Sequence, residues 1–368
     1  MRTTVLTLSL TMAFCAGLQT ARAQESNSVV QAQFATSGQA SNGGDSSFVL
    51  TDDAVPGNAV VSPRYWFTPP AYGTYIQADA LFLSRSHDPA NRPIAVDLTG
   101  GSTTVLSTGN ANLSGSFQPG ALLTLGFNFD QVSAIEATYF GLNSWSNSAQ
   151  ATSPPAGLLG LAGTLQNTTN DFIFADRMSI SYTSEIQNVE ANYKQTIEGL
   201  TLLTGFRYFR LAETFDINSH GAAPPTGSGT TSDYKINLAN QLLGAQFGMG
   251  YTWNWGALNS NLLGKIGPYA NLAHQNTLLQ DSGNTQLLRN YRADTTPVAM
   301  VAEIGLNAGY QVTNWFSLHA GYRFIYIQNV AFAPDQLDLT ASPPGTTVLN
   351  AHSSLFLHGV NVGAEIRW

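Results

Sequence analysis

The chain has 368 residues, of which 10% are charged and 34 are glycine, and its formal net charge is −8. Ordinary soluble proteins carry about 25% charged residues, so this is not the composition of a typical cytosolic enzyme. The acidic balance does not support nucleic-acid binding, and a mean hydropathy of −0.04 is too low for a bundle of membrane-spanning helices. Low charge, abundant glycine and 11% aromatic residues are typical of an outer-membrane β-barrel.

Residues 1–23 are predicted to be a secretory signal peptide. Arg2 precedes a short apolar stretch, and an A-x-A cleavage motif ends at Ala23, so the mature chain is expected to start at Gln24. Cys15 is the one cysteine of the sequence and lies within this segment. The mature chain therefore has no thiol for a disulfide or a thiolate metal site.

Residues 24–72 are rich in Gln, Ser, Asn, Gly and Pro and show no sustained period. This composition predicts a low-complexity, disordered periplasmic extension, for which a plain linker role is the simplest interpretation. Residues 73–368 are predicted to form the outer-membrane β-barrel, an all-β, up-and-down antiparallel fold.

Ten stretches in this region alternate apolar and polar side chains with the period of two that a β-strand requires. In chain order they are 75–84, 120–130, 133–143, 184–194, 200–211, 240–250, 262–273, 298–310, 315–326 and 357–368. Ten is an even number, as expected for a single-chain bacterial barrel.

The connections between these stretches alternate in length. Short turns are predicted near 131–132, 195–198, 252–258 and 313–314, and long polar loops at 87–117, 146–178, 214–232, 278–294 and 330–353. Short turns at one rim and long loops at the other are typical of outer-membrane barrels. A soluble antiparallel sandwich would explain the alternation, but not its combination with the export signal, the loop asymmetry and the terminal aromatic residue.

The last strand ends on Trp368, which completes an apolar stripe that starts at Val360. We expect this stripe to face lipid, and the terminal aromatic residue to be the cue that barrel-assembly machinery recognises. Aromatic residues near strand ends predict girdles at the two membrane interfaces. Trp253 and Trp255 are expected in a periplasmic turn of the lower girdle.

The strand segments carry a resemblance to a known family. "YIQADALFLSRS", "LTGFRYFRLAETF", "NQLLGAQFG", "GYRFIYIQNVAFAP" and "LHGVNVGAEIRW" resemble the planctomycete beta-barrel porin family, and the resemblance covers about residues 73–368. It implies a barrel fold and an outer-membrane location. It brings no substrate, cofactor or catalytic residues with it.

Charged and polar residues on the inward faces are the candidate functional residues. The predicted lumen-lining set is Glu136, Glu190, Arg207, Lys265, Glu303, His319, Arg323, Glu365 and Arg367. These side chains either line a water path that selects ions or pair into a polar plug. Pairing is favoured because a barrel of about ten strands is close to the size that side chains fill. Glu303 and Arg323, at similar distances from one short turn, are expected to touch.

The sequence predicts a narrow porin, or a structural barrel that allows at most passive diffusion of small solutes, with no enzymatic activity and no cofactor or metal. A surface-loop adhesin or receptor is the alternative, since five long loops would serve either. A hydrolase at the rim is the weakest hypothesis, because its candidates His87, His274, His352 and His358, with Asp88 or Asp281, belong to no catalytic motif.

Overall fold

The fold is taken from a computed structural model, which describes residues 73–87, 90–99, 102–153, 158–169, 171–281, 283, 285–341 and 348–368. The expected signal peptide and the extension at 24–72 lie outside the described residues. Within the described ranges, no helix has the length and apolar character needed to span a bilayer.

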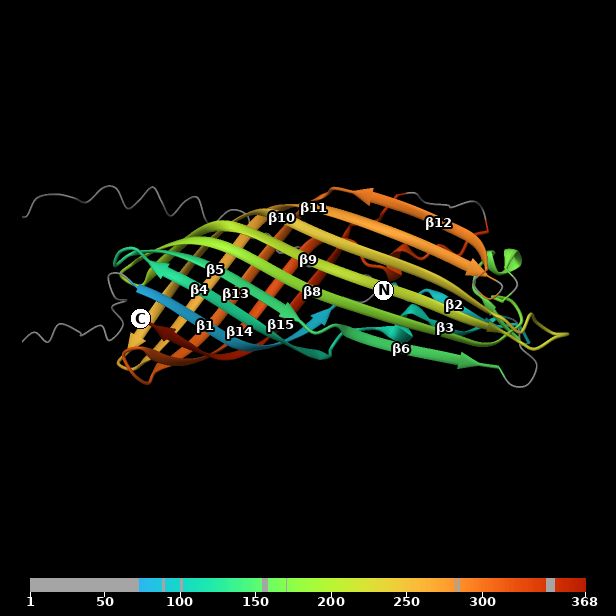
Figure 1. Ribbon diagram of the computed structural model, residues 1–368, viewed down its shortest axis with the longest axis horizontal. Helices are drawn as coiled ribbons and strands as arrows, with labels where there is room; N and C mark the ends of the chain where they lie inside the picture. The colour runs from blue at the N-terminus through green and yellow to red at the C-terminus, as the bar shows by residue number, and fades with distance from the viewer. Residues whose placement is uncertain are drawn as a thin grey trace, which may run out of the picture. The chain divides into compact units, whose positions relative to one another are not determined.

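Ten antiparallel strands close into a barrel (Figure 1). Each of them pairs with the next in chain order, and the ring closes where the first strand pairs with the last, from Tyr75 opposite Arg367 to Ser86 opposite Phe356. The ten are β1 (Gly73–Ser86), β4 (Phe117–Asn128), β5 (Ser133–Leu142), β8 (Ala175–Ile197), β9 (Leu200–Gly221), β10 (Thr231–Trp255), β11 (Leu258–Asp281), β13 (Val298–Gln311), β14 (Phe316–Val330) and β15 (Ser353–Arg367). The prediction of a ten-stranded antiparallel barrel is confirmed.

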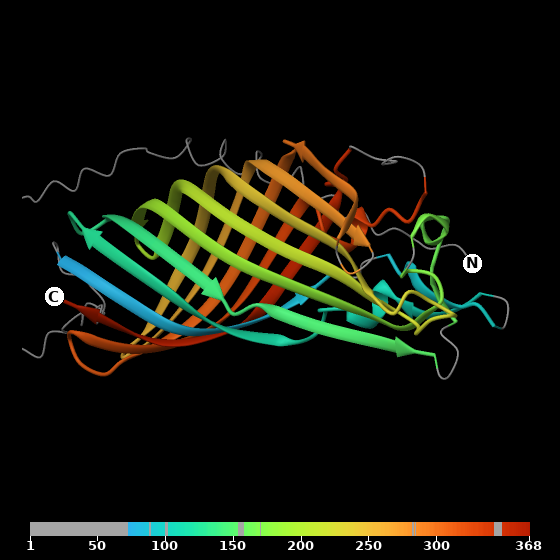
Figure 2. The ribbon, with the colours of Figure 1, turned by 45° about the vertical axis from the view of Figure 1, so that its right-hand side comes forward.

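Five further strands and three short 3-10 helices decorate one end of the barrel. They are β2 (Pro93–Asp97), β3 (Thr103–Ser107), β6 (Trp145–Thr152), β7 (Leu159–Leu161), β12 (Gln286–Thr295), η1 (Thr108–Ala111), η2 (Leu165–Thr168) and η3 (Pro334–Gln336). Strands β2, β3, β6 and β12 gather at the end opposite the C-terminus (Figures 1 and 2). By the predicted topology this is the extracellular end.

Several predicted loops prove to be wrong in extent. The expected loop at 214–232 is mostly strand, because β9 continues to Gly221 and β10 begins at Thr231. The expected loops at 87–117, 146–178 and 278–294 contain β2 and β3, β6 and β7, and β12 respectively. A polar composition does not indicate a loop in this part of the chain, because strands that extend beyond the membrane also carry polar side chains.

The predicted turn at 252–258 is also shorter than expected. Trp253 and Trp255 belong to β10 rather than to the turn, and both side chains are exposed. The neighbouring β8–β9 connection consists of Glu198 and Gly199, with φ of 51° and 87°. Two successive left-handed residues allow a two-residue hairpin whose twist matches its strands.

Large apolar side chains cover the outside of the barrel near the C-terminal end. Phe206 is 68% exposed, Phe247 59% and Ile304 54%. A soluble protein would not leave so many large apolar side chains in water, whereas lipid accommodates them. We call this outward surface the lipid belt.

Beyond the lipid belt the two faces of the strands exchange character. On β9, Phe206 points outward and Arg207 inward, but further along the strand Phe215 and Ile217 are fully buried inside while Asp216 is on the outer face. Strands β8 to β11 carry this inverted zone past the ends of β1 and β4 (Figure 2). The protein therefore has a polar interior within the membrane and an apolar core above it.

The position of the lipid belt predicts how an arginine substitution on each face of β13 affects stability. Ile304→Arg places the charge in lipid and should destabilise the barrel by about 2–4 kcal/mol. Asn307→Arg, three residues away and on the inner face, should cost clearly less because its side chain meets the polar interior. Urea unfolding in detergent micelles measures both. Equal losses would show that the two faces have been wrongly assigned.

Candidate functional site

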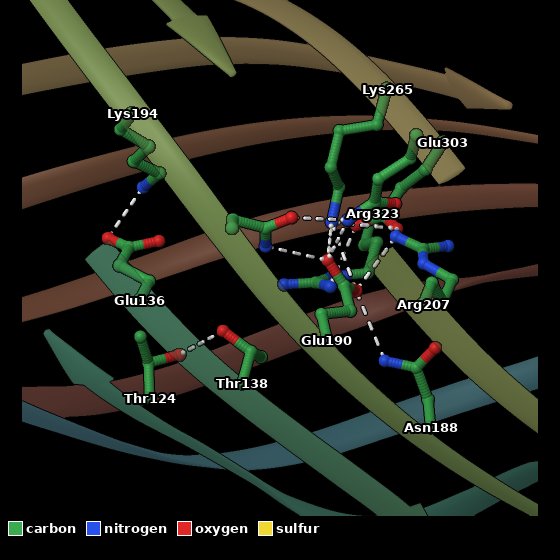
Figure 3. A network of polar contacts seen from close by, with 12 residues as sticks. Thr124, Glu136, Thr138, Asn188, Glu190, Lys194, Arg207, Lys265, Glu303 and Arg323 are labelled. Carbon is green, nitrogen blue, oxygen red and sulfur yellow. Dashed lines mark hydrogen bonds and ion pairs between the residues drawn. The ribbon is translucent and has the colours of Figure 1, made fainter. Parts of the chain in front are cut away.

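Five charged side chains meet inside the barrel (Figure 3). The carboxylates are Glu190 on β8 and Glu303 on β13. Arg207 lies 2.8 Å from Glu190 and also pairs with Glu303. Lys265 lies 2.9 Å from Glu190 and 3.1 Å from Glu303. Arg323 lies 2.8 Å from Glu303. We call these five residues the central charge cluster.

The strand register explains how the central charge cluster forms. Arg207 stands directly opposite Glu190, and Lys265 directly opposite Glu303, so each pair is a cross-strand neighbour on the inner face. The pairs then cross-connect, because Arg207 also reaches Glu303 and Lys265 also reaches Glu190. The expected Glu303–Arg323 contact is present, and it is diagonal, since Arg323 stands opposite Gly305.

Amide groups complete the hydrogen bonding of the buried carboxylates. Gln246 donates to Glu190 at 2.8 Å and Asn188 donates to Glu190 at 3.1 Å. Tyr269 in turn donates to Gln246 at 3.3 Å. Desolvating a charge costs several kcal/mol unless partners replace the lost water. The cluster is thus a packed polar network, and with all members ionised it holds three cations and two carboxylates, an excess of one positive charge.

Glu136, another predicted lumen residue, forms a pair of its own. Its carboxylate accepts a hydrogen bond from Lys194 at 2.6 Å and another from Tyr75. Figure 3 shows this pair apart from the central charge cluster. Lys194 and Tyr75 were missing from the predicted set, although their alternation on β8 and β1 would have placed both on the inner face.

The remaining predicted residues pair near the C-terminal end of the barrel. His319 contacts Asp79, whose carboxylate also accepts from Asn361 at 3.1 Å. Glu365 and Arg367 contact each other along β15. Every member of the predicted set therefore has an ionic or hydrogen-bonded partner among the described residues.

A second buried charge pair lies in the apolar zone above. Arg85 is 1% exposed and donates to Glu213 at 3.0 Å and to Tyr182 at 3.3 Å. Its guanidinium also lies 5.4 Å from the ring centre of Phe332 and 6.0 Å from that of Trp145. Sequence reasoning missed this pair, because an arginine at the end of a strand gives no sign that it is buried.

Phe332 belongs to a segment that folds back into the mouth of the barrel. The side-chain amide of Asn240 donates to the backbone C=O of Ala331 and accepts from its N–H, both at 2.8 Å. The Glu213 carboxylate accepts from the backbone N–H of Ala333 at 2.9 Å. Phe332 is fully buried and stacks on His87 with ring centres 3.5 Å apart. We call residues 331–337 the inward segment. Part of the expected loop at 330–353 is therefore a packed element.

The candidate residues for a hydrolase do not assemble into a site. His87 is occupied by its stacking contact, and His358 faces outward with its Nδ1 bonded to the Tyr322 hydroxyl at 2.7 Å. His274 and His352 are exposed at separate places, and Asp88 lies outside the described residues. Over the described ranges, no group of three or more His, Cys, Asp or Glu residues is placed to bind a metal.

A closed antiparallel barrel with an apolar belt outside and paired charges inside is a transmembrane β-barrel. The family model described as "Putative beta barrel porin-7 (BBP7)" matches residues 73–368. The chain belongs to this family of porin-like outer-membrane barrels, so the resemblance read from the strand segments is confirmed.

Solved structures of other outer-membrane barrels are similar only at the level of the fold. The outer membrane protease OmpT from Escherichia coli is 9% identical over 81% of this chain and 99% of its own, with a TM-score of 0.41. Neisserial surface protein A is 11% identical over 80% and 96%, with a TM-score of 0.25. A FadL homologue from Pseudomonas aeruginosa is 9% identical over 81% and 90%, also at 0.25. No curated protein matches the chain.

The contacts of Glu303 predict strong coupling within the central charge cluster. Glu303→Gln leaves three buried cations facing one carboxylate and should lower the free energy of unfolding by about 3–5 kcal/mol. Arg323→Gln should cost less, because Arg323 is a peripheral member. The double variant should cost less than the sum, since the two changes remove one shared contact. Urea unfolding of the four proteins measures this cycle.

The pair Glu365 and Arg367 provides the matched control. It is more exposed than the central charge cluster, so each single change there should cost about 1 kcal/mol or less. Strictly additive losses at Glu303 and Arg323, or losses no larger than in the control pair, would contradict the description of the cluster as a packed network.

Burial lowers the pKa of His87, which lies outside the membrane-spanning strands, below its usual value of about 6.5. The unfolded chain therefore takes up a proton before the folded barrel does, and stability must fall as the pH drops below about 6.5. His87→Gln should show a smaller loss of unfolding free energy between about pH 8 and about pH 5 than the wild type. Parallel pH profiles would contradict this assignment.

Proposed function

We propose that the protein is a low-conductance barrel that is closed at rest and allows at most passive passage of small solutes when it opens. The observation that supports the proposal is that packed groups lie in the interior at two levels, which we take to be two barriers in series. The central charge cluster lies in the interior at the level of the lipid belt, and the inward segment packs into the apolar zone above it. Both barriers are held by specific contacts, which supports a defined closed state.

Two barriers in series predict an unusual mutational pattern. Resistances in series add, so opening one barrier should raise conductance only slightly while the other remains. The first change is Glu303→Ala with Arg323→Ala, and the second replaces residues 331–337 by a Gly-Ser linker. We expect a large rise in planar-bilayer conductance only when both changes are combined. A wild-type barrel with a large, stable conductance would overturn the proposal.

The selectivity of the opened barrel gives an independent readout. The central charge cluster carries an excess positive charge when ionised, and it retains this excess after one carboxylate and one cation are removed together. Fixed charge in a narrow pore favours the counter-ion. The combined variant should therefore prefer anions in a salt-gradient reversal-potential measurement. Removing Glu136 and Lys194 together is the control, since that neutral pair lies apart from the cluster.

A second candidate function, a surface receptor or adhesin, has one observation in its favour. Strands β8 to β11 are 22 to 25 residues long, which is at least twice the 9–11 residues that a membrane-spanning strand needs. Their upper halves therefore present a folded platform outside the membrane. Binding of the purified barrel to cells or to envelope polysaccharide, lost on trimming these strands above the lipid belt, would favour this function.

A further inference from the structure

A polar hollow lies on the outside of the barrel where the lipid belt ends. Its volume is about 580 Å³, which falls within the range of about 300–1,000 Å³ that ligand sites occupy. It is lined by Ser144, Thr183, Ser184, Glu185, Arg210, Ala212, Glu213, Thr214, Asn237, Leu238, Ala239, His274 and Asn276. We call it the rim hollow.

The level of the rim hollow is fixed by the residues just below it. On β9, Arg210 follows Phe206 by four residues on the same outward face, a rise of about 13 Å along the strand. On β11, His274 follows Leu272, which is 50% exposed. The outward faces therefore change from apolar to polar at this height, which is where lipid headgroups lie.

The rim hollow holds charges of both signs that do not pair with each other. Glu185 stands opposite Ala212, and Arg210 opposite Gln187, so the two charged residues are diagonal neighbours about 7–8 Å apart at the backbone. No ion pair within the described residues engages Arg210. The Glu185 carboxylate accepts from Gln187 at 2.6 Å and keeps further acceptor capacity.

A polar atom without a partner adds to the lining. The side-chain oxygen of Asn276 is buried and has no hydrogen-bond partner among the described residues, and Asn276 lines the rim hollow. Buried polar groups are normally satisfied by a partner, by water or by a ligand.

A separate apolar groove lies deeper in the lipid belt, about 13 Å along β9 from Arg210. It has a volume of about 840 Å³ and crosses the outward faces of β4, β5, β8, β9 and β10. Ala137, Ala191, Phe206 and Ala245 stand side by side across β5, β8, β9 and β10, so small side chains flank the ring of Phe206 on both sides. The groove and the rim hollow share strands β8, β9 and β10, with the groove on the membrane side.

We propose that the rim hollow and the apolar groove together bind one zwitterionic phospholipid of the phosphoethanolamine type. The Arg210 guanidinium takes the phosphate, for which its planar, two-pronged donor geometry is suited. The Glu185 carboxylate on the neighbouring strand takes the ammonium group. An acyl chain lies in the groove over Ala191.

The charge pattern favours this headgroup over a purely anionic one. An anionic lipid would satisfy Arg210 but leave Glu185 facing another negative charge. The nearest charges on β12 also balance, since Asp294 stands opposite His274 and Arg292 opposite Asn276. A headgroup that carries both signs, spaced as phosphate and amine, matches this surface.

Native mass spectrometry of the full mature chain, purified in detergent and titrated with phosphatidylethanolamine, tests the proposal. Arg210→Gln and Glu185→Gln should each weaken the single high-affinity adduct about tenfold. Arg177→Gln, an exposed arginine further from the membrane, is the matched control and should bind like the wild type. Ala191→Trp fills the groove and should weaken the intact lipid but not soluble glycerophosphoethanolamine.

Phosphatidylglycerol and inorganic phosphate separate the possible sources of binding. We expect phosphatidylglycerol to bind at least about tenfold more weakly and free phosphate to give no adduct. Equal affinity for the two lipids, or a loss with Arg210→Gln that Glu185→Gln does not reproduce, would overturn the zwitterionic assignment. Adducts unchanged by Arg210→Gln, Glu185→Gln and Ala191→Trp would overturn the site. Because every change is on the outer surface, resistance to unfolding in SDS should match the wild type.

Discussion

Closure of the hydrogen-bond ladder is the constraint on which the rest of the structure depends. A strand in lipid cannot leave N–H or C=O groups unpaired, since no water is there to satisfy them. The first and last strands therefore pair from Tyr75 opposite Arg367 to Ser86 opposite Phe356, and the backbone of Trp368 exchanges two 3.0 Å hydrogen bonds with Thr74. Ring closure encloses an interior that must then be filled or hydrated, and in this barrel paired charges lie within it.

The interior charges follow from the same period of two that builds the lipid belt. Once alternate residues face lipid, the others face inward, and the polar ones among them must find partners across the lumen. The opposed pairs Arg207–Glu190 and Lys265–Glu303 are the result of strand register, and their cross-connections depend on the curvature that closes the ring. The alternation therefore predicts which residues point inward. It does not predict which charges pair with each other, because several partners come from strands that are distant in the sequence. The predicted contact between Glu303 and Arg323 is the exception, since one short turn joins their strands.

The sequence predicted the strands within the membrane better than those above it. Within the belt, apolar residues face out and the alternation is unambiguous. Above the belt, the apolar residues Phe209, Leu211 and Phe215 face in, so the phase of the pattern shifts by one residue between Tyr208 and Phe209. A shift of this kind resembles the end of a strand, which is why the pattern predicts a loop where β9 continues. The inward segment left no periodic signal at all, because it is fixed by single contacts such as those of Asn240.

The exchange of apolar and polar faces along the strands also explains how one sheet is stable both in lipid and in water. In lipid an apolar exterior is required, and the polar interior is stabilised by ion pairs. In water the same ribbon of strands needs a polar exterior, and an apolar core stabilises it as in a soluble sandwich. The crossover must fall at the headgroup level, since either surface would be unfavourable in the other solvent. The rim hollow lies on that crossover, where charged and apolar residues come together on adjacent strands, and this is the reason that a lipid with a charged head and an apolar tail matches it.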